Sequence, residues 1–182
     1  YSGMVALVGE KSAGKTEAAI KLVAKLAVKY GSSAVVLVAA EENCGDKSAL
    51  HRVSALTGVG LLSVSADGDW ADKLRECAQY KYVVIDTSLA DDEKGKALLD
   101  TLRNAEIPID EILVLPANAE KRFLQQSIAA YKHKNTLATI ASFFDRCVSR
   151  GEFISTLICE KLSLMYLGTG TLLPEYLVKP EL

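Results

Sequence analysis

The chain has 182 residues, enough for one domain with a substantial hydrophobic core that needs no disulfides or metals. Hydrophobic residues make up 49% and charged residues 24%, a balance that excludes a disordered or membrane-embedded chain. The net charge of -2 excludes a global positive field, so we expect no nucleic-acid partner and only a local anion site.

Short apolar runs alternate along the chain with stretches of helical period, which is typical of repeated βα units around a parallel sheet. The predicted strands are 4–8, 34–39, 61–64, 82–85, 111–115, 136–141 and 164–167. The predicted helices are one that begins at the loop after the first strand, then 47–56, 71–79, 92–103, 119–131 and 151–161. This order predicts a three-layer α/β fold, in which helices cover both faces of a parallel sheet.

The first predicted helix has apolar residues at helical spacing on one side, and Lys21, Lys25 and Lys29 fall on the opposite side. We therefore expect these three lysines on a polar face. Gly31 supplies the residue type at which helices commonly end.

Between the first strand and this helix, the segment Gly9-Glu10-Lys11-Ser12-Ala13-Gly14-Lys15-Thr16 matches G-x-x-x-x-G-K-[ST] at every fixed position. Glycines let the backbone curl so that successive amide groups point at phosphate oxygens, and the helix N-terminus adds positive charge. We expect the loop and the following Glu17 to bind nucleotide. Lys15 would neutralise the β and γ phosphates, and Thr16 would be a ligand of Mg²⁺. The alternatives are an ordinary glycine-rich turn and a phosphate loop that has stopped binding nucleotide.

A magnesium nucleotide site also needs a carboxylate at the end of a buried strand. Asp86 closes the run Tyr82-Val83-Val84-Ile85 and is the best candidate for a second Mg²⁺ ligand. The alternative is an aspartate that caps a helix or a turn.

These motifs resemble those of the signal-recognition-particle type GTPases, and within that family most closely those of its flagellar branch. Family members read GxxGxGKTTTxAKLA at the phosphate loop, whereas this chain has Glu17-Ala18 in place of two threonines. Of the family's Asp-Thr-Ala-Gly, Asp86-Thr87 survive, and Leu89 replaces the glycine.

The guanine-reading Thr-Lys-x-Asp falls at 142–145, where the terminal Asp145 survives and Phe143 replaces the lysine. The stretch from Leu164 to Leu177 resembles the closing segment of the flagellar members.

The resemblance implies a GTP-binding P-loop domain that uses Mg²⁺, with Asp145 reading guanine and Phe143 stacking on the base. The candidate catalytic residues are Lys15 and Glu41, which would replace a family aspartate if the alignment shifts by one residue. A family arginine is missing after the second strand, so we expect weak or lost hydrolysis. Leu89 replaces a flexible glycine, so we expect only a small conformational change between nucleotide states. Alternatively, Phe143 and Phe144 are core residues and Asp145 caps a loop.

The resemblance further implies contacts across the nucleotide face, either in a homodimer or with another protein, and a role in flagellar or polar placement or in protein targeting. Peripheral association with the inner membrane would follow from that role. Two alternatives remain: a pseudo-GTPase that acts as an interaction module, and an ATPase or small-molecule kinase of the wider P-loop class.

No apolar run reaches the roughly 18 residues of a membrane span, and the N-terminus carries no secretion signal, so we expect a cytoplasmic protein. Because the chain opens on a strand pattern with no initiator Met, we expect a single domain over 1–182 cut from a longer chain. The cysteines Cys44, Cys77, Cys147 and Cys159 lack metal-ligand spacing, and we expect reduced, structural thiols.

Overall fold

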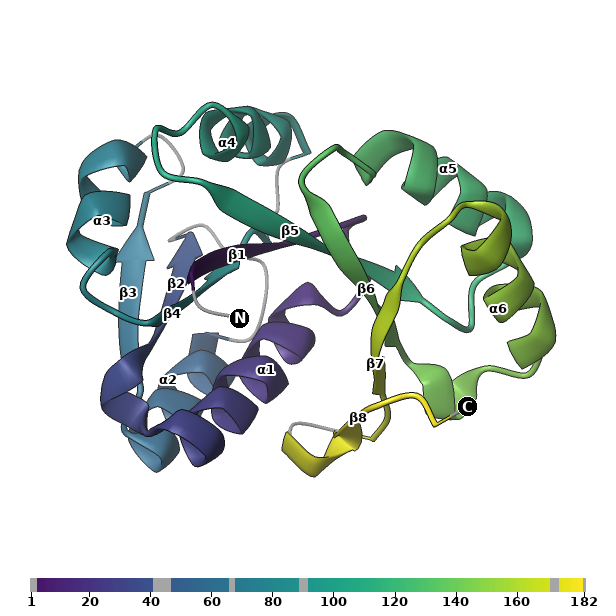
Figure 1. The fold of residues 1–182 in the computed structure, drawn as a ribbon, viewed down its shortest axis with the longest axis horizontal. Helices are drawn as coiled ribbons and strands as arrows, with labels where there is room; N and C mark the ends of the chain where they lie inside the picture. The colour runs from purple at the N-terminus through teal and green to yellow at the C-terminus, as the bar shows by residue number, and fades with distance from the viewer. Residues whose placement is uncertain (1–2, 41–46, 66–67, 89–91, 171–173, 182) are drawn as a thin grey trace.

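The computed structural model describes residues 3–40, 47–65, 68–88, 92–170 and 174–181. Within these residues the strands form one eight-stranded sheet in the order β3-β2-β4-β1-β5-β6-β7-β8 (Figure 1). Neighbouring strands pair in parallel from β3 to β7, and β8 runs antiparallel to β7. The predicted parallel α/β architecture is therefore confirmed.

The strands lie where the apolar runs predict them. They are β1 (Gly3–Val8), β2 (Val35–Ala40), β3 (Gly60–Val64), β4 (Tyr82–Asp86), β5 (Ile109–Pro116), β6 (Thr136–Ser142), β7 (Leu164–Gly168) and β8 (Leu177–Val178). Strand β8 was not predicted, because a strand of two residues is too short to show any alternation of polar and apolar side chains.

Six α-helices connect the described strands: α1 (Lys15–Tyr30), α2 (Lys47–Thr57), α3 (Trp70–Cys77), α4 (Asp92–Arg103), α5 (Lys121–Tyr131) and α6 (Arg150–Cys159). Three short 3-10 helices, η1 (Ser32–Ala34), η2 (Phe144–Arg146) and η3 (Pro174–Tyr176), complete the connections. Each predicted helix is present, with its ends within two residues of the expected positions.

The helices cover both faces of the sheet. Buried residues of α1 and α2 pack with Val5 and Leu7 of β1 in one core, and residues of α3 to α6 pack with Ala6 and Val8 in the other (Figure 1). Because successive side chains of a strand point to opposite faces, both faces of β1 are apolar and buried. Two-sided burial is the reason that the strands read as continuous apolar runs.

Helix α1 ends at the predicted stop. Gly31 has a φ of 88°, and its amide donates to the carbonyl of Ala27 at 2.9 Å, which closes the last turn. The prediction that Lys21 lies on a polar face is wrong, since only 2% of Lys21 is exposed, whereas Lys25 is half-buried and Lys29 is exposed. Lys21 is buried because the segment after β7 crosses α1 and presents carbonyl groups to its ammonium.

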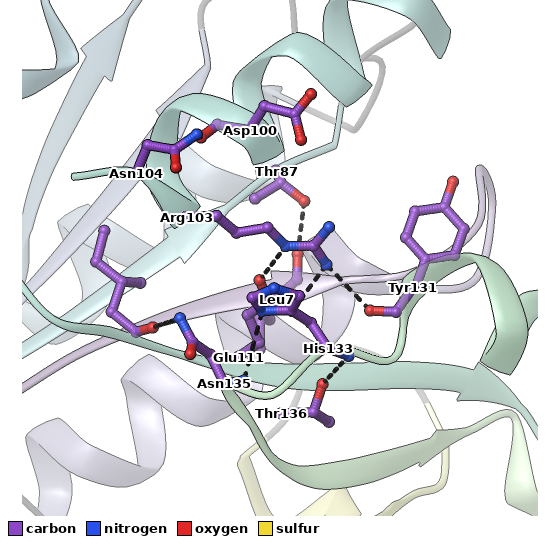
Figure 2. A network of polar contacts seen from close by, with 11 residues as sticks. Leu7, Thr87, Asp100, Arg103, Asn104, Glu111, Tyr131, His133, Asn135 and Thr136 are labelled. Carbon is purple, nitrogen blue, oxygen red and sulfur yellow. Dashed lines mark hydrogen bonds and ion pairs between the residues drawn. The ribbon is translucent and has the colours of Figure 1, made fainter.

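A partly buried polar network connects elements of the core that contains Ala6 and Val8, at the opposite end of the sheet from the phosphate loop (Figure 2). Arg103 of α4 donates to both carboxylate oxygens of Glu111 in β5, at 2.7 and 3.0 Å, and to the carbonyl of Tyr131 in α5 at 3.1 Å. The hydrogen bond to Glu111 raises the pKa of Arg103 above its usual value. Three elements are therefore joined by one guanidinium group.

The described cysteines are unpaired, as expected: Cys77 and Cys147 are buried, Cys159 is exposed, and Cys44 lies outside the described residues. Burial raises the pKa of the Cys77 thiol. Among the described helices, none has both the length and the apolar composition that crossing a membrane would require.

The strand order places one end of the sheet in a position to bind a ligand. Strand β1 lies between β4 and β5, so the chain leaves β1 at the point where the order of the strands changes direction. Open parallel sheets bind ligands at such switch points, beyond the carboxyl ends of the strands. The loop after β1, the end of β4 and the end of β6 all meet at this edge.

Candidate functional site

The phosphate loop has the curled backbone that anion binding requires. Gly9, Ser12 and Gly14 have φ values of 145°, 60° and 87°. A Cβ on Gly9 would lie 2.5 Å from the carbonyl oxygen of Val114 in β5, so only glycine fits there. The loop leads directly into Lys15, the first residue of α1, where the helix N-terminus concentrates positive charge.

Lys15 is held against the loop that precedes it. Its Nζ donates to the carbonyl of Gly9 at 2.9 Å and to the carbonyl of Glu10 at 2.8 Å, and only 7% of the residue is exposed. The loop thus positions the ammonium beside the amide groups that would surround a phosphate. To contact a phosphate directly, Lys15 would exchange these carbonyl acceptors for phosphate oxygens.

The two residues predicted to hold a metal lie in contact. Thr16 Oγ1 donates to Asp86 Oδ2 at 2.7 Å, although the two residues are 70 positions apart in the chain. Asp86 is fully buried at the end of β4, and its other oxygen accepts from the amide of Ser88 at 3.1 Å and from the Ser88 hydroxyl at 2.6 Å. A hydroxyl beside an oriented carboxylate is a set of hard oxygen donors that suits Mg²⁺.

Ser88 is a residue of this cluster that sequence reasoning did not assign a role. Its Oγ lies 3.1 Å from Thr16 Oγ1 and donates to Asp86, so it fixes the direction of the carboxylate. The available signal was a hydroxyl two residues after an aspartate that ends a strand, a spacing that favours local side-chain to backbone hydrogen bonds. Among the described residues there is no group of three His, Cys, Asp or Glu that could form a metal site made of protein ligands alone.

The end of β6 forms the other wall of the site. The hydroxyl of Ser142 donates to the carbonyl of Ala13, which ties β6 to the phosphate loop. Phe143 has a φ of 53°, and its ring lies beside Gly14, with Cζ 3.3 Å from the position that a Gly14 Cβ would occupy. Asp145 follows in η2 and is exposed.

The two phenylalanines of this segment therefore have different surroundings. Phe144 packs edge-on against Phe153 of α6, with ring centroids 6.5 Å apart, at the border of the core. Phe143 instead lines a small hollow at the start of α1, together with Gly14, Glu17 and Lys21. The alternative that both rings are core residues fits Phe144 and does not fit Phe143.

A larger cavity, of about 390 Å³, lies at the far end of α1 and is lined by residues such as Leu26, Tyr30 and Tyr82. It is at the amino ends of the strands and at the C-terminus of α1, where the helix dipole disfavours an anion. The loop, by contrast, presents amide groups and a helix N-terminus, which are the features that favour an anion. The catalytic candidate Glu41, and Leu89, lie outside the described residues.

No protein-family model matches the chain. In sequence, it is similar to the flagellar biosynthesis protein FlhF of Pseudomonas aeruginosa, with 26% identity over 176 residues. This match covers 95% of the chain and 41% of the relative, so the chain spans about two fifths of the length of that curated protein.

Solved structures share the fold. A crystal structure of FlhF complexed with GTP and Mg²⁺ matches with a TM-score of 0.80 and 18% identity, over 98% of this chain and 70% of that one. The cell division protein FtsY of Thermotoga maritima matches with a TM-score of 0.70 and 22% identity, over 100% of this chain and 66% of that one. The signal recognition particle 54 kDa protein of Aeropyrum pernix, in complex with GDP, matches with a TM-score of 0.62 and 20% identity, over 95% of this chain and 42% of that one.

Proposed function

Because the chain has the fold of the signal-recognition-particle type GTPases and resembles FlhF in sequence, we propose that it binds GTP together with Mg²⁺ at its phosphate loop. The observation that carries this proposal is the 2.7 Å contact between Thr16 of the loop and the buried Asp86 of β4. A chance glycine-rich turn would have no reason to meet a buried carboxylate from a strand 70 residues further along the chain.

Each part of the site has a role in this proposal. The amides of the loop and the N-terminus of α1 bind the phosphates, and Lys15 moves from the carbonyls of Gly9 and Glu10 to the phosphate oxygens. Thr16 and Asp86 hold the metal, which supplies positive charge beside the phosphates. Ser88 keeps the Asp86 carboxylate oriented.

Base recognition is proposed at the end of β6. Asp145 is an exposed carboxylate that accepts the two hydrogen bonds offered by the guanine edge, and the neighbouring ring of Phe143 stacks on the base. The contact between the Phe143 ring and Gly14 supports this arrangement, because it means that an aromatic ring lies next to the start of α1.

We further propose that hydrolysis is weak or lost. No arginine follows β2 within the segment 41–46, and a transition-state arginine contributes roughly three to five powers of ten in rate in related phosphoryl-transfer enzymes. The domain would then act through nucleotide-dependent contacts, in a homodimer or with another protein, across its nucleotide face. A cytoplasmic role in flagellar or polar placement, at the surface of the inner membrane, accords with the name of the FlhF relative.

Isothermal titration of the purified chain with GTP, GDP and ATP, with and without Mg²⁺, tests the proposal. We expect a preference for guanine nucleotides and tighter GTP binding in Mg²⁺. Lys15→Ala should weaken GTP binding at least about tenfold, because a charge-assisted contact to phosphate is lost. Lys134→Ala, which removes an exposed lysine after α5, serves as the control and should have no effect.

Three results would contradict parts of the proposal. No binding of any nucleotide at millimolar concentration would favour a pseudo-GTPase that serves as an interaction module. A preference for ATP would favour an ATPase of the wider P-loop class. GTP turnover by the isolated chain at the rate of an efficient GTPase would refute the loss of hydrolysis.

A further inference from the structure

Glu17 lines a small hollow beside Phe143, on the side of the loop where base recognition is proposed. It belongs to the first turn of α1, two residues after Lys15, and lines the hollow together with Gly14, Lys21 and Phe143. The hollow has a volume of only about 10 Å³. A single water molecule needs about that much space, so a purine ring requires the surrounding side chains to move.

Lys21 fixes the Glu17 carboxylate in this position. Its Nζ donates to Glu17 Oε1 at 2.6 Å, to the carbonyl of Thr169 at 3.0 Å and to the carbonyl of Gly170 at 3.1 Å. An ammonium group has three donors, and these contacts use all of them. The Lys21 side chain is 2% exposed and that of Glu17 is 32% exposed, so the carboxylate balances a buried charge and its displacement is unfavourable.

Glu17 also interacts with the helix terminus that a phosphate would use. A carboxylate in the first turn is attracted to the positive end of the helix dipole. In the nucleotide complex, that same end faces the phosphates, and the carboxylate then lies close to a second set of negative charges. Glu17 therefore stabilises the nucleotide-free protein and opposes nucleotide binding.

We propose that Glu17 is an affinity-determining residue. Its side chain occupies the hollow beside Phe143 and brings negative charge to it, which keeps the nucleotide affinity of this chain low. This inference rests on the proposed function, because it concerns the same site. The nucleotide enters only when Glu17 turns away from the hollow, and Lys21 then keeps its two carbonyl acceptors in the segment after β7. The position is chain-specific, since the resemblance described above has threonine there.

Titration of the full chain and of Glu17→Thr and Glu17→Gln with GTP and GDP tests this inference. We expect Glu17→Thr to bind GTP about tenfold tighter or better, since it removes both the charge and the bulk from the hollow. Glu17→Gln keeps the bulk and loses the charge, so its affinity should fall between those of the unmodified chain and Glu17→Thr.

Glu76→Gln is the matched control. Glu76 forms an ion pair of the same length, 2.6 Å, with Lys73 on the surface of α3, away from the loop. Its replacement should leave GTP affinity unchanged. Circular dichroism melting curves of all variants would verify that each one folds before the affinities are compared.

The possible results separate this inference from the proposed function. Tighter binding by Glu17→Thr than by the unmodified chain supports the inference. If the unmodified chain binds GTP and Glu17→Thr binds no better, the inference is overturned and the proposed function stands. If neither chain binds GTP at millimolar concentration, both are overturned, since removal of the carboxylate then opens no site.

Discussion

Two lysines in the first half of α1 show how single residues acquire a role from their acceptors. Lys15 and Lys21 are both buried, and both donate to backbone carbonyls from outside the helix. Lys15 is bound by the loop that it follows, and Lys21 by a segment about 150 residues away. The first arrangement follows from the motif, and the second depends on the whole fold.

Asp145 is the residue at which guanine and adenine would be distinguished. We predict that Asp145→Ala weakens GTP binding about 10- to 100-fold and leaves ATP binding unchanged, because hydrogen bonds to a charged acceptor are lost only with guanine. Isothermal titration with both nucleotides measures the effect.

Glu152→Ala, which removes another exposed carboxylate from the nearby helix α6, controls for a general change of charge. An equal loss of affinity for GTP and ATP in Asp145→Ala would show that Asp145 does not read the base.

At the scale of elements, the junction of β1 with the phosphate loop depends on close backbone contact with β5. Gly9 approaches Val114 so closely that a Cβ would lie 2.5 Å from the Val114 carbonyl oxygen, at a φ of 145°. Two separate costs would therefore arise from a side chain at this position: a strained backbone and a steric clash.

We predict that Gly9→Ala lowers the free energy of unfolding by about 2–4 kcal/mol, because both costs apply. Gly31→Ala isolates the first cost, since Gly31 has a φ of 88° and nothing within 4 Å of an added Cβ. It should lose less, about 1–2 kcal/mol. Urea denaturation followed by circular dichroism gives both values, and equal losses would show that the Val114 contact is unimportant.

At the scale of the whole molecule, Arg103 joins two helices, α4 and α5, to strand β5 (Figure 2). The Glu111 side chain is 4% exposed and the Arg103 side chain 20% exposed, so their ion pair is largely removed from water. Removal of one partner would leave the other as an unpaired buried charge.

We predict that Arg103→Ala lowers the free energy of unfolding by about 3 kcal/mol, measured by urea denaturation. Arg75→Ala breaks a surface ion pair in which the Arg75 side chain is 57% exposed and that of Asp72 is 71% exposed. It should lower the free energy of unfolding by at most about 1 kcal/mol. If Arg103→Ala lost no more than Arg75→Ala, the network would be no more stabilising than a surface pair.

Much of the fold was predictable from the sequence because its signals are local. A strand buried on both faces must be apolar at consecutive positions, and this rule located seven of the eight described strands. The phosphate loop was equally clear, since its glycines and the adjoining helix are contiguous in the chain. The assignment of Asp86 followed from its place at the end of such a strand.

Only the tertiary structure decided which distant residues meet. The sheet order brings Asp86 and Ser88 to Thr16, and the segment after β7 buries Lys21 and, through it, positions Glu17 in the hollow. A repeating pattern of apolar residues records which face of an element is buried, and it carries no information about which other element covers that face. The sequence by itself therefore determined the elements and the phosphate loop. The pairing of the strands, and the packing of the segment after β7 across α1, decided the surroundings of each site residue.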